Sequence, residues 1–218
     1  MTEYNSGMPA LADAAPALAH LARQAHARGW ALGTSGNFSS VLSTEPLRLA
    51  ITSSGADKGR LEPSQIVAVD GRGSVLEGDG RPSAETAVHL AIVRARGAGA
   101  VAHTHSAWST LLSDVYAPAG GLAIEGYEML KGLAGVATHS HREWVPIVEN
   151  TQDWEAAAPR LVEVLEGHPD AHAFLIRRHG LYTWGRDVGE AARHLEVMEF
   201  LLEAVGRAGR EGEPAWPR

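Results

Sequence analysis

Two histidines separated by one residue, His103 and His105, stand at the end of a short apolar run that is typical of a strand. Side chains two apart on a strand point to the same face, so both imidazoles can bind one metal ion. Catalytic zinc usually has three protein ligands and one open position, so a third ligand must come from elsewhere in the chain. We predict His179, because it follows a predicted strand (174–178) and precedes Gly180, where the backbone can turn tightly.

A second pair of the same spacing, His139 and His141, lies in a polar segment that no apolar strand precedes. We predict an exposed loop there, with no metal role. The other histidines of the predicted helices and loops are expected to be solvated or to pack against neighbours. They are His20, His26, His168, His172 and His194.

Two carboxylates could transfer protons in such a site. Glu85 is predicted in the first turn of a helix, where its charge either favours the helix N-terminus or places an acid or base near the metal. Glu128 stands between apolar neighbours, which indicates burial and a carboxyl able to hold or give a proton. The alternative for Glu128 is a structural pair with Lys131, three residues later. For both glutamates the residue pattern leaves the alternatives open.

Loops that combine hydroxyl groups with glycine could bind an anion. Residues 34–37 and 52–55 have this composition, Lys58 closely follows the second loop, and Ser83 is expected at another helix N-terminus. The chain contains neither a Walker pattern nor a dinucleotide-binding glycine pattern. Together with the histidine cluster, these loops favour a small phosphorylated substrate.

Strands and helices must alternate along the chain to position these residues, which indicates an α/β or α+β class in a single domain. Pro16 is expected near the start of the first helix, and Ser83 is expected to cap the second. The predicted helices cover residues 14–28, 83–96, 107–113, 152–165 and 188–205. The predicted strands cover residues 47–52, 65–70, 73–76, 99–105 and 144–148, with a hairpin over 173–184. Segment 126–133 is consistent with either a helix or a strand.

Composition narrows the class of protein further. The 218 residues carry a formal net charge of −7, which argues against nucleic-acid and membrane partners. The absence of cysteine excludes disulfides and thiolate chemistry. With no apolar run of membrane-spanning length and no signal-peptide pattern, we expect a cytoplasmic protein. Residues 1–8 are predicted as a flexible N-terminal tail, 9–206 as the catalytic domain and 207–218 as a C-terminal tail.

The order of these motifs resembles that of the class II aldolase superfamily, over residues 18–205. The motifs are Gly36-Asn37-x-Ser39, Ser54-Gly55, Pro82-Ser83-Ala84-Glu85, His103-Thr104-His105-Ser106 and Arg178-His179-Gly180. Segments 54–59, 128–133 and 179–185 are most similar to its dehydratase branch, lyases that remove water from a methylthio-substituted ketopentose phosphate in methionine salvage. An aldolase or epimerase of the same superfamily is the alternative, and a non-catalytic scaffold domain is a further one.

This resemblance implies an α/β fold, a single-domain three-layer α/β/α sandwich with a central, mainly antiparallel sheet. It implies a homotetramer with active sites near subunit interfaces, and one zinc ion per subunit held by His103, His105 and His179. Glu128 takes the place of the dehydratase acid/base, and Glu85 matches the acid/base of the aldolases. The residues implied for substrate and phosphate binding are Ser35, Gly36, Asn37, Ser53, Ser54, Gly55, Lys58 and Ser83.

Overall fold

The computed structural model describes residues 10–209, which form a nine-stranded sheet in the order β4-β3-β2-β1-β5-β9-β8-β7-β6. Every neighbouring pair is antiparallel except β7 and β8, so the expected mainly antiparallel sheet is confirmed. The strands are β1 (Asn37–Thr44), β2 (Leu47–Thr52), β3 (Ile66–Asp70), β4 (Val75–Glu77), β5 (Ala100–Thr104), β6 (Gly121–Ile124), β7 (Glu143–Val148), β8 (Ala173–Ile176) and β9 (Gly180–Gly185).

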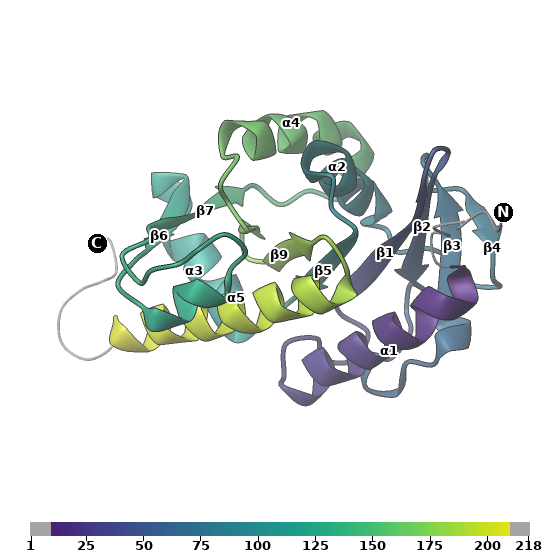
Figure 1. Cartoon of the computed structure of the whole chain (residues 1–218), viewed down its shortest axis with the longest axis horizontal. Coiled ribbons are helices and arrows are strands. Elements are labelled where there is room, and N and C mark those ends of the chain that lie inside the picture. The colour runs from purple at the N-terminus through teal and green to yellow at the C-terminus, as the bar shows by residue number, and fades with distance from the viewer. Residues whose placement is uncertain (1–9, 210–218) are drawn as a thin grey trace, which may run out of the picture.

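Helices cover both faces of this sheet (Figure 1). The α-helices are α1 (Leu11–Ala27), α2 (Thr86–Arg96), α3 (Ala107–Val115), α4 (Trp154–Gly167) and α5 (Val188–Ala208). Short 3₁₀ helices are η1 (Lys58–Arg60), η2 (Pro63–Gln65), η3 (Ala117–Ala119) and η4 (Glu128–Gly132). None of the helices within residues 10–209 combines the length and the apolarity needed to cross a bilayer.

Two hydrophobic cores lie on opposite sides of the sheet and complete the three-layer sandwich. Helices α1, α3 and α5 pack over one face, and helices α2 and α4 pack over the other. Strand β2 shows the alternation that builds both cores: Leu49 and Ile51 pack with α2 and α4, whereas Ala50 between them faces α1. The alternating side chains of this strand are therefore buried on both faces of the sheet.

Two predicted helix starts are wrong. Helix α1 already begins at Leu11, and Pro16 lies inside it because buried residues on either side hold the helix against the sheet. Helix α2 begins at Thr86 and not at Ser83. The Ser83 hydroxyl accepts from the backbone N–H of Glu85 (3.2 Å), so it closes a turn before the helix.

Strand β1 was not predicted over its range, and the ambiguous segment 126–133 contains the 3₁₀ helix η4. The predicted N-terminal tail lies outside the described residues, and so does the predicted C-terminal tail after residue 209. Helix α5 extends through residues 207 and 208, beyond the predicted domain end. The domain boundaries otherwise stay a prediction.

Candidate active site and metal centre

Strand β5, between β1 and β9 in the sheet, places His103 opposite Asn37 and Tyr182. The His103 side chain is buried and stacks on the Tyr182 ring, with centroids 3.9 Å apart. Its Nδ1 lies 2.9 Å from the carbonyl oxygen of Leu181. A carbonyl can only accept, so Nδ1 carries the proton and the Nε2 lone pair of the neutral ring is left for another partner.

Four side chains converge at this lone pair. The Nε2 atoms of His103 and His105 are 2.7 Å apart, and Glu85 Oε2 lies 3.3 Å from His103 Nε2. The other carboxylate oxygen of Glu85 is 3.1 Å from His179 Nε2. One ligand atom from each of these residues lies within 4.8 Å of all the others. The structure thus brings the three sequence-predicted histidines together, with Glu85 beside them.

His179 reaches the cluster through a tight turn between β8 and β9. Arg178 has a positive φ of 54°, and the His179 N–H donates to the Ile176 carbonyl across 3.1 Å. A Cβ atom on Gly180 would lie 2.0 Å from the backbone oxygen of Thr104. Only glycine allows β9 to approach β5 this closely directly after His179.

The histidines of the cluster fit a divalent metal ion. Burial lowers the pKa of His103 well below its usual value, and His105 and His179 nearby lower it further. Burial, followed by the effect of His179, lowers the pKa of His105 to about 4. Neutral imidazoles with converging lone pairs are the state that binds a metal, and three imidazoles with one carboxylate suit zinc and similar ions.

A network of buried polar groups orients Glu85. Its Oε2 accepts from Asn37 Nδ2 (2.7 Å) and from the Tyr182 hydroxyl (3.0 Å). The Oδ1 of Asn37 bonds in turn to Nε2 of His89, whose Nδ1 is 2.6 Å from the Ser39 hydroxyl. Burial lowers the pKa of His89 to about 4, so the ring is neutral and can accept from Ser39. Tyr182 was not predicted as a site residue, because its contact with Glu85 depends on its register opposite His103.

A cavity of about 280 Å³ opens beside the cluster. Glu85, His105 and His179 line it. All of the residues predicted to bind substrate and phosphate line it as well: Ser35, Gly36, Asn37, Ser53, Ser54, Gly55, Lys58 and Ser83. Chain segments far apart in sequence therefore supply hydroxyl and amide donors to a single space.

Two of these residues have properties suited to an anion. The Ser53 hydroxyl is buried and has no hydrogen-bond partner among the described residues. Lys58 is buried, and its Nζ donates to the carbonyl oxygens of Thr34 (3.1 Å) and Ala56 (2.9 Å). Burial lowers the pKa of Lys58 to about 8, against the opposing effect of Asp57. A bound anion would compensate this buried cation.

The prediction that Glu128 is buried is wrong. Its side chain is 71% exposed on η4 and pairs with Lys131. The hydrogen bond from Lys131 lowers the pKa of Glu128, and His139 Nδ1 lies 3.8 Å from the carboxylate. Glu128 does not line the cavity of its own chain. Apolar neighbours in the sequence did not bury it, because in a 3₁₀ turn Leu130 faces the core while Glu128 faces outward.

Comparison with known proteins places this geometry in a family. Residues 16–205 match the class II aldolase and adducin N-terminal domain. The methylthioribulose-1-phosphate dehydratase of Methylococcus capsulatus is 46% identical over 181 residues, which are 83% of this chain and 86% of the relative. That of Sorangium cellulosum is 41% identical over 207 residues, which are 94% of this chain and 97% of the relative. The chain belongs to the methylthioribulose-1-phosphate dehydratases of the class II aldolase family.

A solved L-fuculose 1-phosphate aldolase supports the fold of this dehydratase. Its TM-score is 0.77 at 24% sequence identity, with 98% of this chain and 93% of that chain covered. Class II aldolase family members are generally metal-dependent, and the cluster of Glu85, His103, His105 and His179 is a possible metal site of the same kind. As a dehydratase, the enzyme is a hydro-lyase.

Proposed function

We propose that this enzyme removes water from 5-methylthioribulose 1-phosphate and forms 5-methylthio-2,3-diketopentyl 1-phosphate in methionine salvage. The observation that carries the proposal is the convergence of a three-histidine cluster and an anion-binding set in one cavity. A phosphate held at one end of the cavity orients the ketose, and orientation removes much of the barrier to its reaction.

The residues His103, His105 and His179 would hold one zinc ion per subunit. When bound, the ion would supply Lewis acidity to the C2 carbonyl and thereby make the C3 proton easier to remove. Glu85 contacts two of the three histidines, which supports a role on the metal side of the site. Asn37 keeps this carboxylate in place through its 2.7 Å hydrogen bond.

The phosphate group would bind to the loops around Asn37, Ser53 and Ser83, with Lys58 as the cation. The buried hydroxyl of Ser53, which has no hydrogen-bond partner among the described residues, supports this role, and so does the buried ammonium group of Lys58. The two carbonyl oxygens that accept from Lys58 carry no negative charge to balance its ammonium group. Binding of a phosphate dianion would satisfy both groups.

The elimination needs a proton for the leaving C4 hydroxyl, and we assign this proton to Glu128. Loss of the C3 proton and of the C4 hydroxyl, which departs as water, gives an enol that tautomerises to the 2,3-diketone. Glu128 lies outside the cavity of its own chain. A homotetramer in which Glu128 serves the cavity of a neighbouring subunit is consistent with this position. The cytoplasmic location predicted from the sequence stays a prediction.

Metal content and turnover, measured on one purified sample, test the function. We expect about one zinc ion per chain at this site and loss of water from 5-methylthioribulose 1-phosphate, with no cleavage of fuculose 1-phosphate. Cleavage of the fuculose ester without dehydration would identify an aldolase instead. A chain with neither metal nor turnover would be a scaffold domain. His103→Ala is expected to lose the metal ion of this site together with activity, and an unchanged zinc content in this variant would contradict the ligand assignment.

A further inference from the structure

A second group of metal-ligating side chains lies away from the candidate active site. Glu143 Oε2 is 2.9 Å from His141 Nε2 and 3.0 Å from His172 Nδ1, and the three ligand atoms all lie within 4.8 Å of one another. Glu143 is the first residue of β7, and His172 directly precedes β8. Because β7 and β8 are parallel neighbours, their N-terminal ends lie together and bring these residues into contact.

The carboxylate at the centre of this group is buried. Glu143 is 1% exposed, and its other oxygen, Oε1, accepts from the backbone N–H of His172 across 2.8 Å. A buried carboxylate that is not paired with a cation lowers the free energy of unfolding by roughly several kcal/mol. The compensating cation lies at Oε2, where the two imidazoles converge: it is a proton on His172 Nδ1, 3.0 Å away, or a metal ion that replaces this proton.

The surroundings of His172 show which kind of cation fits. Its Nε2 is 2.8 Å from the carbonyl oxygen of Ala134, so this nitrogen carries a proton. Nδ1 faces Glu143 Oε2 across 3.0 Å, so when this nitrogen carries no proton its lone pair is directed at the carboxylate and can bind a metal ion there. A histidine that donates one N–H to a backbone carbonyl and presents its other nitrogen to a shared point is the usual arrangement of a metal-bound histidine.

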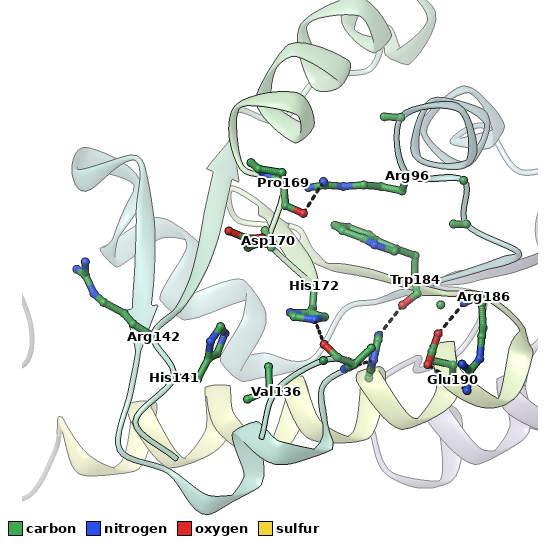
Figure 2. Close-up of a pocket in the computed structure, with 18 residues that line it drawn as sticks. Arg96, Val136, His141, Arg142, Pro169, Asp170, His172, Trp184, Arg186 and Glu190 are labelled. Atoms are coloured by element: carbon green, nitrogen blue, oxygen red, sulfur yellow. Dashed lines mark hydrogen bonds and ion pairs between the residues drawn. The ribbon is translucent and has the colours of Figure 1, made fainter. Parts of the chain in front are cut away.

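The group opens into a cavity of about 800 Å³. His141 and His172 line this cavity, and Figure 2 shows both rings above helix α5. The cavity shares no lining residue with the 280 Å³ cavity beside His103. A metal held by two histidines and one carboxylate here would keep an open coordination position toward solvent, as three-ligand zinc sites do.

We propose that His141, Glu143 and His172 form a second divalent-metal site of zinc type, separate from the cluster at His103. No metal role is predicted for His141 from the sequence because no strand precedes it, yet the other two ligands come from the first residue of β7 and from the residue directly before β8. A bound ion would also link β7 to residues 128–134, the segment that contains Glu128 and Ala134. Ala134 in that segment accepts from His172 and donates its N–H to His194 Nε2 across 3.0 Å.

Metal stoichiometry tests this site independently of the catalytic function. Purified full-length protein is loaded with zinc, dialysed against metal-free buffer and analysed for zinc per chain. We expect about two ions per chain in the wild type and one fewer in His141→Ala. The matched control is His139→Ala, because His139 is an exposed histidine of the same loop, 60% exposed and outside the cluster. It is expected to retain both ions.

A second measurement isolates the site. In the His103→Ala/His105→Ala double variant, one equivalent of Co²⁺ is expected to give the visible absorption of a bound ion and to raise the thermal midpoint. Adding His172→Ala is expected to abolish both effects. A wild type that binds only one ion, lost with His103, would overturn the proposal and leave an ion pair between Glu143 and His172. Equal loss of zinc in His139→Ala and His141→Ala would also overturn it, because surface histidines would then explain the binding.

Discussion

Replacing Lys58 with methionine separates substrate binding from metal binding. Among the described residues that line the 280 Å³ cavity, Lys58 is the only lysine or arginine. Methionine keeps the length of the buried stem and fills the same space without charge. We expect Lys58→Met to retain its metal content, because Lys58 donates to the carbonyl oxygens of Thr34 and Ala56 and not to the three histidines of the cluster.

The expected loss of kcat/KM in Lys58→Met follows from the hydrogen bonds of the ammonium group. Of its three N–H donors, two are used by the carbonyl oxygens of Thr34 and Ala56, so one remains for a ligand in the cavity. A hydrogen bond between charged groups contributes about 1.5–3 kcal/mol, equivalent to a factor of about 10 to 150. We therefore expect kcat/KM for the phosphate ester to fall about 10- to 150-fold in Lys58→Met.

The pH dependence provides a second readout. The pKa of Lys58 is lowered from 10.5 to about 8, chiefly by burial, so the folded protein loses this charge as the pH rises through about 8. Substrate affinity of the wild type is expected to fall above this pH, and Lys58→Met is expected to lack the decline. Between about pH 8 and 10.5 the unfolded chain binds more protons than the folded chain. The cost of burying the lysine therefore decreases as the pH rises through this window.

Steady-state kinetics at several pH values, with zinc content measured on each sample, check these expectations. The matched control is Arg60→Met, which removes an exposed cation from the same 3₁₀ helix. We expect it to change kcat/KM less than about twofold, because exposed charges contribute little. A Lys58→Met enzyme with unchanged kcat/KM, or with an alkaline decline like that of the wild type, would refute the assignment of Lys58 to the phosphate.

Three further variants test the site and its support. Glu128→Gln is expected to abolish turnover with zinc retained. Co-expression of this variant with His103→Ala is expected to restore about a quarter of the sites, because in random assembly half of the sites have an intact His103 and half of these receive an intact Glu128. Inactive mixed assemblies would contradict donation of Glu128 by a neighbouring subunit. Tyr182→Phe removes a donor to the carboxylate beside the histidines and should weaken zinc binding about 10- to 100-fold in chelator competition; unchanged affinity would show that the hydroxyl does not orient the site. Gly180→Ala places a methyl group 2.0 Å from a backbone oxygen of β5, so the thermal midpoint should fall, by about 2–4 °C per kcal/mol lost. A thermal midpoint equal to that of the wild type would mean that β5 and β9 can move apart enough to accommodate the methyl group.

The three histidines of the candidate metal site could be predicted because they depend on local rules. His103 and His105 follow from the period of a strand, and His179 from a strand followed by glycine. The contacts of Tyr182 and Asn37 with Glu85 could not be predicted in the same way, because they arise from register across β1, β5 and β9. Register depends on long-range pairing that a single sequence does not specify locally.

Strand β1 was not predicted for a related reason. Its core positions include serines, and Ser39 and Ser40 are buried in the sheet although serine is typical of loops. Each has a partner that only the folded chain supplies: Ser39 bonds to His89, and Ser40 donates to the Gly99 carbonyl. A buried polar strand next to a functional site therefore has the composition of a loop until its partners are known.

The opposite surroundings of Glu85 and Glu128 assign them different tasks. Glu85 is nearly buried, and the donors Asn37 and Tyr182 fix its orientation, so it is suited to face a cation and has little freedom to move. Glu128 is 71% exposed, and its pairing with Lys131 lies at the surface of the chain. A general acid must carry a proton when the hydroxyl leaves, whereas the hydrogen bond from Lys131 lowers the pKa of Glu128. Because this pairing lies at the surface, packing against another subunit can replace it and allow the carboxyl to take up a proton. The exposure that contradicts the predicted burial of Glu128 is therefore compatible with its proposed role, provided that assembly brings it to a neighbouring cavity.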